Sequence, residues 1–338
     1  MPPRDPLEGG RLLVVMPGHV GIAESFSANL RHLGVDHRVA TYTECTGRVP
    51  YAHFGQRLAN LLCKLRGDRG YRQRMMRRLQ LERLWEGVGP GEFDHILCIR
   101  PDLLPVEDIE RLRARAPRIF AYTWDGLGRF GGTLERRHLF EKFHVFDPVD
   151  ARPGAGMPLL GNFYFDCYPE LLPSVDRPPA DAYFIGQHDD RWPVIDRLAR
   201  DLVALGLRPD IQQYIGTSGQ FENPPPHVTV LRQQKPYATA LAESLRCRIL
   251  IDIHQPNLHG GLSFRPYEAL GYGRKLITSN PLALRQDFHH SANIYCLGHD
   301  RRSLTEFLAE PLVPVPEDVR ARHGFSAWIR RALDLPAR

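Results

Sequence analysis

A short stretch of the sequence, residues 260–281 (GGLSFRPYEALGYGRKLITSNP), combines residue types that bind phosphorylated ligands. Its glycine pair follows an apolar run, and Ser263 then offers a good N-cap for a helix. The amide groups and positive dipole end of such a helix suit a diphosphate. Arg265 adds a fixed charge with fork geometry for phosphate oxygens, and Glu268 can accept hydrogen bonds from two ribose hydroxyls. The stretch is therefore predicted to form a nucleotide pocket.

The neighbouring turns and strands supply further candidates for this pocket. Gly271 and Gly273 are expected to end the helix, and Lys275 to open a strand that ends close to Asn280. A second glycine turn at Gly186 follows another apolar run, and its loop would face the same diphosphate. The predicted ligand-binding residues are Gly186, Arg191, Gly261, Ser263, Arg265, Glu268, Lys275 and Asn280.

An ordinary packing unit would give the same pattern. In that interpretation the glycines only permit close packing of a helix, a turn and a strand. Arg265 and Glu268, three residues apart, would then form a surface ion pair that contributes little. The sequence leaves both interpretations open.

The elements that must position these residues follow a regular alternation. Apolar runs of strand length alternate with longer runs of helical spacing, which predicts parallel sheets covered by helices. Strands are predicted at 11–16, 37–42, 95–100, 118–125, 144–148, 181–186, 210–215, 227–231, 248–253, 275–279 and 293–297. Helices are predicted at 22–33, 54–86, 192–205, 237–245, 263–272, 303–309 and 325–333.

The chain is long enough for two domains. Its 338 residues, 43% hydrophobic and 25% charged, exceed one ordinary domain and suit two of about 150 residues each. The alternation breaks at 173–179 (PSVDRPP), the candidate linker, and then restarts. We therefore predict an α/β protein of two tandem Rossmann-like domains facing a cleft. The predicted parts are Rossmann-like domains at 1–172 and 180–320 and a final helical segment at 321–338.

The motifs resemble those of a known enzyme group. The run 264–281 is similar to the donor-site signature of GT-B glycosyltransferases, in which a helix carrying E-A-(L/M)-x-x-G precedes a strand. Four further motifs, in this order, are similar to bacterial surface-polysaccharide and lipopolysaccharide glycosyltransferases, including CgeB-like proteins. These motifs are YTWD (122–125), FDPVDA (146–151), LLGNFYFD (159–166) and YFIGQHDDR (183–191).

This resemblance covers roughly residues 95–310 and implies a function. It implies a glycosyltransferase (EC 2.4 class) that uses a nucleotide-sugar donor, contacts the donor ribose through Glu268, and transfers to a glycan or lipid-linked acceptor in polysaccharide synthesis. It also implies that 1–172 is the acceptor domain, that 180–320 is the nucleotide-sugar donor domain, and that the final helix at 321–338 packs back on the N-terminal domain. Many retaining members carry a second glutamate eight residues before the ribose-binding one, but Gly260 occupies that position here. The departure favours an inverting mechanism.

An inverting transferase needs a base that takes a proton from the acceptor hydroxyl. In a GT-B protein this base lies on the N-terminal domain, where His19 and Asp125 each follow a predicted strand. The base could be a His19–Asp125 dyad or Asp125 alone. Equally, His19 could be a loop histidine with no catalytic role, and Asp125 could only cap a turn. Asp147 and Asp150 are expected to cap the turn after the fifth strand.

We expect no metal and no cofactor beyond the nucleotide-sugar substrate. Asp189 and Asp190 resemble the DxD pair of other glycosyltransferases, but that device belongs to a different fold, so a helix-capping role is favoured. The cysteines are scattered and form no metal-ligand or disulfide pattern: Cys45, Cys63, Cys98, Cys167, Cys247 and Cys296.

The basic character of the chain belongs to one segment, 57–83. It holds nine basic residues against two acidic ones, a local excess of +7 in a chain whose net charge is +5. A solvated helix face is one interpretation, and peripheral contact with an anionic membrane is the other. Nucleic-acid binding is disfavoured because no recognition motif accompanies the charge.

No signal peptide or run of about 20 apolar residues is evident, so we expect a cytoplasmic protein that can lie at the inner face of the cytoplasmic membrane. Two alternatives stay open. One is another enzyme of the same fold, such as a nucleotide-sugar epimerase. The other is a non-catalytic two-domain protein that binds a sugar or nucleotide.

Overall fold

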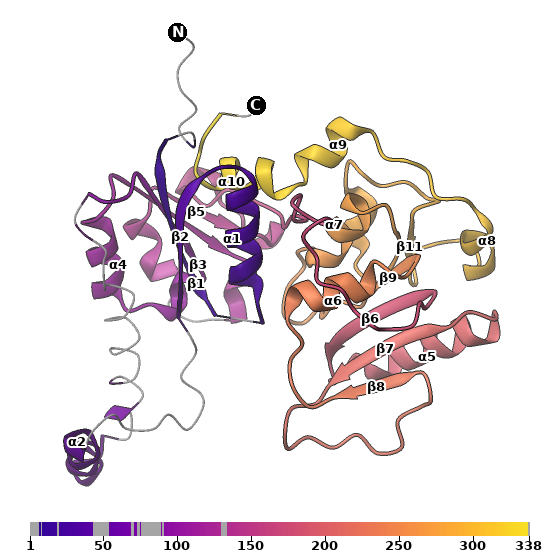
Figure 1. Ribbon diagram of the computed structural model, residues 1–338, viewed down its shortest axis with the longest axis horizontal. Helices are drawn as coiled ribbons and strands as arrows, with labels where there is room; N and C mark the ends of the chain where they lie inside the picture. The colour runs from indigo at the N-terminus through magenta and orange to yellow at the C-terminus, as the bar shows by residue number, and fades with distance from the viewer. Residues whose placement is uncertain are drawn as a thin grey trace.

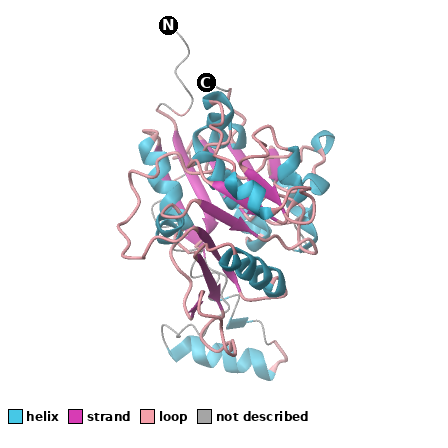
Figure 2. Cartoon of the chain, turned by 90° about the vertical axis from the view of Figure 1, so that its right-hand side faces the viewer, coloured by secondary structure: helices cyan, strands magenta, loops and turns pink. Residues whose placement is uncertain are grey.

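The computed structural model describes residues 7, 9–18, 20–42, 54–68, 71–72, 75, 89, 91–129 and 134–336. These residues form two parallel β-sheets, one in each half of the chain, with helices packed on them (Figures 1 and 2). Within the described residues no helix combines the length and apolar character that a membrane span requires. The α/β architecture predicted from the sequence is confirmed.

The N-terminal sheet has the strand order β2-β1-β3-β4-β5, and all its strand pairs are parallel. Its strands are β1 (Arg11–Pro17), β2 (Asp36–Tyr42), β3 (His95–Ile99), β4 (Arg118–Thr123) and β5 (Lys142–Val145). Helix α1 (Ile22–His32) packs on one face and α4 (Val106–Arg113) on the other, in two separate hydrophobic clusters. Helix α2 (Phe54–Leu65) lies apart from both sheets (Figures 1 and 2).

The C-terminal sheet has the order β11-β10-β9-β6-β7-β8 and is also parallel. Its strands are β6 (Ala182–Gln187), β7 (Pro209–Tyr214), β8 (Val228–Leu231), β9 (Ile249–Asp252), β10 (Lys275–Thr278) and β11 (Ile294–Cys296). Helices α5 (Trp192–Ala204) and α8 (Leu304–Ala309) cover one face, and α7 (Phe264–Gly271) covers the other. The strand order reverses between β6 and β9, where an open α/β sheet forms its ligand crevice.

The end of the chain returns to the N-terminal domain. After α9 (Glu317–Arg322), helix α10 (Phe325–Ala332) buries Phe325 and Trp328 against Phe26 of α1, with ring centroids 5.1 and 5.9 Å away. Trp328 also packs edge-on against Tyr122 of β4, 5.0 Å away. The last segment (yellow in Figure 1) therefore bridges the two domains and completes the N-terminal core.

The two domains also share core contacts at α6 (Tyr237–Ser244). Leu241 of this helix belongs to the same hydrophobic cluster as Phe26, Phe163 and Trp328. Tyr237 donates its backbone N–H to the carbonyl of Val20, in the turn after β1 (2.6 Å). Helix α6 is thus buried between the sheets rather than on the outside of one.

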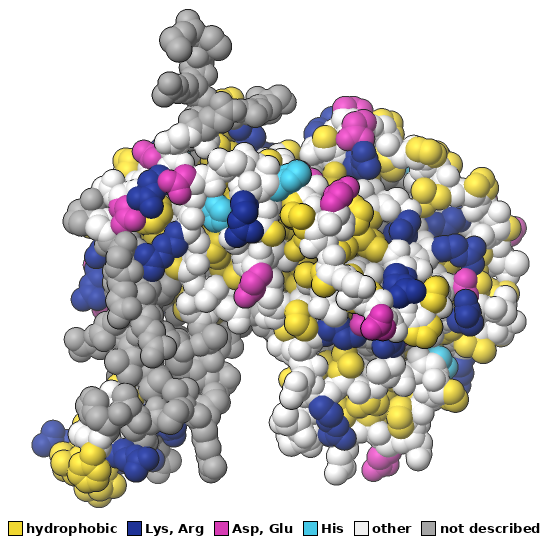
Figure 3. Space-filling model, in the orientation of Figure 1, with side chains coloured by type: hydrophobic (Ala, Val, Ile, Leu, Met, Phe, Trp, Pro, Cys, Tyr) yellow, Lys and Arg dark blue, Asp and Glu magenta, His cyan; other side chains and the backbone are white. Residues whose placement is uncertain are grey.

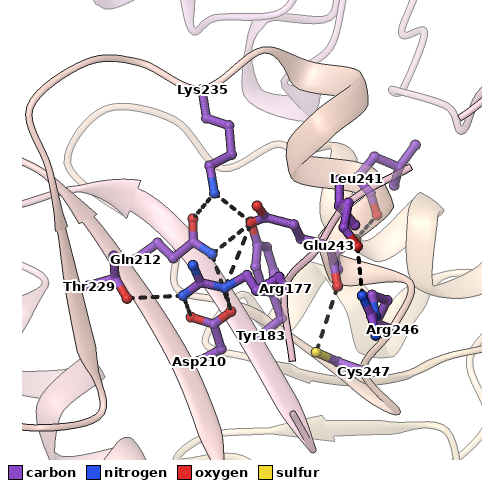
Figure 4. Close-up of polar contacts among 12 residues, drawn as sticks. Arg177, Tyr183, Asp210, Gln212, Thr229, Lys235, Leu241, Glu243, Arg246 and Cys247 are labelled. Carbon is purple, nitrogen blue, oxygen red and sulfur yellow. Dashed lines mark hydrogen bonds and ion pairs between the residues drawn. The ribbon is translucent and has the colours of Figure 1, made fainter. Parts of the chain in front are cut away.

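The candidate linker 173–179 is anchored to the C-terminal sheet by a network of charges (Figure 4). Arg177 pairs with Asp210 of β7, and the Asp210 carboxylate, ahead of the opposing effect of burial, raises the pKa of Arg177. Lys235 donates to Glu243 Oε2 (2.6 Å) and to Gln212 Oε1 (2.8 Å), which closes the network under α6. Because each charge has an opposite partner, this segment is fixed in place rather than free.

Candidate functional site

Helix α7 begins at the carboxyl edge of the C-terminal sheet, beside the point where the strand order reverses. Ser263 is its N-cap, as predicted, and the Ser263 hydroxyl accepts from the Arg265 N–H at 3.2 Å. The same hydroxyl donates to Asp252 Oδ1 (2.8 Å), while Thr278 donates to Asp252 Oδ2 (2.9 Å). Asp252 at the end of β9 therefore fixes the start of α7 against β10. It was missed by sequence analysis, although a carboxylate that ends a buried strand (RILID) was the available signal.

Glu268 is the centre of a buried polar cluster. Its side chain is only 1% exposed, and its two oxygens accept hydrogen bonds from Arg265 Nη1 and from the Tyr237 hydroxyl, both at 2.6 Å. The interpretation of Arg265 and Glu268 as a weak surface pair is therefore wrong. Arg265 also lies over the ring of Tyr183, 5.5 Å from its centroid.

The electrostatics of this cluster follow from burial and pairing. Burial alone would lower the pKa of Arg265, but the Glu268 carboxylate and the Tyr183 and Tyr237 hydroxyls together raise it. Burial, reinforced by Glu268, raises the pKa of Tyr237 well above its ordinary value. Arg265 is thus a permanent cation and Tyr237 a permanent hydrogen-bond donor across the physiological range.

The glycine loop before α7 is held by the N-terminal domain. Gly260 donates its N–H to Asp147 Oδ2 (2.6 Å), and Asn162 donates to the Leu262 carbonyl (2.9 Å). A Cβ atom on Gly261 would lie 2.6 Å from the Phe146 ring, so only glycine fits there. The structure gives Gly261 a packing role across the two domains. Asp147 also caps the turn after β5, as predicted, because it accepts from the Val149 N–H.

Arg191 and Asp189 lie in the loop after β6. Arg191 donates two bonds to the Asp189 carboxylate (2.9 and 2.8 Å) and one to the Ile253 carbonyl (2.8 Å), which ties the β6 and β9 loops together. Burial alone would raise the pKa of Asp189, but the bonds from Arg191 lower it. Gln255 donates to the same carboxylate (2.8 Å). Gly186 lies within β6, one residue before its end.

Two residues predicted to bind the ligand, Lys275 and Asn280, make other contacts in the structure. Lys275 begins β10 and so lies at the amino edge of the sheet, opposite the start of α7; its Nζ donates to the Phe307 carbonyl (2.6 Å). There it lines a separate cavity of about 400 Å³ with Arg248 and Glu310. The prediction of Lys275 as a ligand residue is therefore wrong. Asn280 donates to the carbonyls of both glycines at 260 and 261 (3.2 and 3.0 Å), so it shapes the loop.

On the N-terminal domain, Asp125 follows β4 at the carboxyl edge and pairs with Arg100, which follows β3. Arg100 Nη1 donates to Asp125 Oδ2 (2.7 Å), and Arg100 also makes a two-point contact with Asp102. Burial alone would lower the pKa of Arg100, but the two carboxylates together raise it. Sequence analysis missed Arg100, although an arginine directly after a buried strand was visible. His19 lies outside the described residues. Asp150 accepts from the Leu127 N–H in the loop after β4 (2.7 Å), so the prediction that it caps the turn after β5 is wrong.

Two histidines in the loop 253–263 also escaped sequence analysis. His254 Nδ1 lies 3.2 Å from the Ser279 hydroxyl, and burial lowers the pKa of His254, which favours the neutral ring at pH 7. His259 Nδ1 lies 3.2 Å from the Gly261 carbonyl, and its ring packs 5.2 Å from Phe146. Their spacing in IHQPNLHGG matches no motif, so only the fold brings them to the domain boundary. Among the described residues, no group of three or more His, Cys, Asp or Glu side chains is arranged to hold a metal.

Comparison with known proteins identifies the architecture. The sequence matches no known family profile, and no curated protein matches it. Among solved structures, apo OtsA aligns over 97% of this chain and 100% of its own, with a TM-score of 0.52 and 13% identity. A UDP-forming α,α-trehalose-phosphate synthase from Burkholderia xenovorans aligns over 96% and 98%, with a TM-score of 0.51 and 11% identity. The chain has the GT-B fold. At these identities the likeness concerns the fold alone.

In this GT-B chain the carboxyl edges of the two sheets meet. A Cβ atom on Gly126, next to Asp125, would lie 2.6 Å from the Leu258 carbonyl oxygen and 3.5 Å from the His259 side chain. The loop that carries Asp125 therefore contacts the loop that leads into α7. The ring of Trp124, next to Asp125, also lies 6.4 Å from the ring of Phe264 in α7, so the end of β4 and the start of α7 lie at the same domain boundary.

Proposed function

We propose that this chain is a glycosyltransferase that moves a sugar from a nucleotide-sugar donor to a glycan or lipid-linked acceptor. The observation that carries the proposal is the start of α7, which lies at the crevice between β6 and β9 with Arg265 in its first turn. Helix N-termini at such crevices bind phosphate groups. The fold shared with a UDP-forming synthase supports a nucleoside diphosphate as the leaving group.

The donor contacts follow from the geometry of α7. The amides at the helix start and the Arg265 guanidinium bind the diphosphate. Gly186 near the end of β6 and Arg191 in the loop after it lie on the other side of the diphosphate. Glu268 accepts from the ribose through the second lone pair of its carboxylate oxygens, each of which already accepts one bond, from Arg265 or from Tyr237. Asn280 keeps the glycine loop in place.

The proposed chemistry is a single displacement with inversion, as the glycine at position 260 favours. Asp125 takes the proton of the acceptor hydroxyl while that oxygen forms a bond to the anomeric carbon, and the bond to the diphosphate breaks. Arg100 orients the Asp125 carboxylate. His19 remains a proposed partner or alternative base. The leaving diphosphate is stabilised by Arg265 and the helix amides, so the proposed reaction needs no metal.

The proposed setting is bacterial surface-polysaccharide or lipopolysaccharide synthesis at the inner face of the cytoplasmic membrane. The supporting feature is the basic segment 57–83, which suits an anionic leaflet or the phosphates of a lipid-linked acceptor.

A donor screen tests the proposal. The full chain is mixed with UDP-, GDP-, CMP- and dTDP-sugars, and both the melting temperature and slow donor hydrolysis are measured. We expect one nucleotide class to raise the melting temperature and to be hydrolysed. Epimerised sugar without hydrolysis would indicate an epimerase, and a melting shift without turnover a binding protein. No response to any donor would contradict the proposal.

A further inference from the structure

Helix α2 exposes its large apolar side chains and buries small or polar ones. Five large apolar side chains form one stripe along it and are between 47% and 77% exposed: Phe54, Leu58, Leu61, Leu62 and Leu65. The opposite side of the helix carries small or polar residues instead, and these are buried or half-buried: Gln56, Ala59, Asn60 and Cys63. A surface helix normally buries its apolar face. The stripe therefore needs an occupant outside the two sheets.

Basic residues flank this stripe. With 100° between successive residues, Arg57 and Lys64 lie on one side of it and Arg66, just after the helix, on the other. Asp68 is the only acidic residue among 54–68. Figure 3 shows apolar side chains (yellow) next to Lys and Arg (dark blue) at the position that α2 occupies in Figure 1. An apolar stripe with basic edges is the pattern of a helix that lies in an anionic membrane surface.

We propose that α2 is a docking helix that inserts its apolar stripe into an anionic phospholipid surface. This inference rests on the proposed function, which includes a lipid-linked acceptor, and it names the element that brings the enzyme to the membrane. Insertion buries the five side chains, while Arg57, Lys64 and Arg66 stay at the level of the lipid phosphates.

The size of the stripe argues against a second copy of the chain as the occupant. A helix of 12 residues is about 18 Å long, and its stripe is no wider than the roughly 10 Å helix diameter. Its five large side chains are far fewer than the roughly 20–30 residues that each partner contributes to a stable protein interface. A bilayer has no such requirement, because binding grows with each inserted side chain.

Vesicle sedimentation tests the inference without any sugar donor. The full chain is incubated with phosphatidylcholine vesicles, with and without 30% phosphatidylglycerol, at low and high salt. We expect pelleting only with the anionic vesicles. The variant Leu58→Gln/Leu61→Gln/Leu62→Gln should lose at least ten-fold in vesicle affinity, because glutamine preserves the helix but not the apolar stripe. Arg57→Gln/Lys64→Gln should lose the preference for anionic lipid and its salt dependence.

The matched control replaces exposed leucines elsewhere, with Leu171→Gln/Leu205→Gln, which start 57% and 41% exposed. We expect this control to pellet like the wild type. Vesicle binding that is absent, or unchanged in the triple variant, would overturn the inference. So would a wild-type dimer that becomes a monomer in the triple variant without any vesicle binding. Donor-induced melting shifts, measured on the same proteins, report on the proposed function separately.

Discussion

The buried carboxylate of Glu268 gives the most quantitative prediction. In Glu268→Ala, Arg265 loses its counter-ion and the Tyr237 hydroxyl loses its acceptor, both of which now bond at 2.6 Å. Breaking a buried ion pair costs about 3–5 kcal/mol, and an orphaned buried hydroxyl costs about 1–3 kcal/mol. Because one carboxylate serves both partners, the two costs overlap, and we expect a loss of about 4 kcal/mol.

A decrease of about 4 kcal/mol in the free energy of unfolding is large for the C-terminal domain. For a domain of this size it corresponds to a decrease of about 8–16 °C in Tm. The assay is urea unfolding followed by circular dichroism, with Tm as a second measure. Glu268→Gln keeps an acceptor for Tyr237 and should lose less. Arg265→Met/Glu268→Gln leaves no unpaired charge, so it should be more stable than Glu268→Ala.

These variants separate folding from ligand binding. If Glu268 accepts from the ribose, Glu268→Gln should fold and yet bind the donor nucleotide more weakly. The reasoning would be refuted if Glu268→Ala lost less than about 1 kcal/mol, since that is the value of an exposed pair. It would also fail if the double variant were less stable than Glu268→Ala.

Three further predictions concern other parts of the boundary and the core. Asp125→Asn should reduce turnover by about 100- to 10,000-fold, with nucleotide affinity unchanged in titration calorimetry. The control Asp102→Asn, which removes the other partner of Arg100, should keep turnover within about ten-fold of the wild type. Normal turnover by Asp125→Asn would exclude Asp125 as the base. Gly126→Ala should lower kcat/KM by about 10- to 100-fold because its Cβ meets the Leu258 carbonyl, whereas Gly128→Ala has open space around it and should not. The same kcat/KM in both variants would mean that the loop of Gly126 does not contact the loop of Leu258. Burial, reinforced by the charge of Lys142, lowers the pKa of His144 from 6.5 to about 4. Between these two pH values the unfolded chain therefore binds more protons than the folded chain. The free energy of unfolding should then fall by about 3 kcal/mol as the pH drops from 6.5 to 4. His144→Phe should remove that part of the acid destabilisation in urea unfolding at pH 7 and pH 4, and an unchanged pH dependence would show that the ring is solvated.

The elements were predictable because periodicity is a local property. Each predicted strand overlaps a strand of the structure, although the one predicted at 144–148 shares only two residues with β5. The helix expected at 263–272 is α7 with Ser263 as its cap. Helix α4 was missed, although Pro105 followed by two acidic residues is a typical helix start. The helix predicted at 54–86 is only partly testable, since α2 ends at Leu65 and much of the rest lies outside the described residues.

The partners of the site residues were not predictable, because they lie far apart in the chain. Tyr237 and Glu268 are separated by 31 residues, and Asp147 and Gly260 by 113. Only the packing of two domains joins them. The error at Lys275 was avoidable, since a residue that opens a parallel strand lies at the edge opposite the ligand loops. The sequence also could not show that Glu268 is buried, because its burial depends on α6 from another part of the chain.

The central claim is that the start of α7 binds the diphosphate of a nucleotide-sugar donor. Titration calorimetry of the full chain with UDP, GDP and dTDP tests it most directly, with CMP as a control that carries no diphosphate. Arg265→Lys and Lys275→Met are the paired variants. We predict one-to-one binding of one nucleotide with a micromolar Kd, weakened about ten-fold by Arg265→Lys, which keeps the charge but loses the fork, and unchanged by Lys275→Met. Binding of none of the three diphosphates, binding of CMP alone, or equal weakening by both variants would contradict the claim.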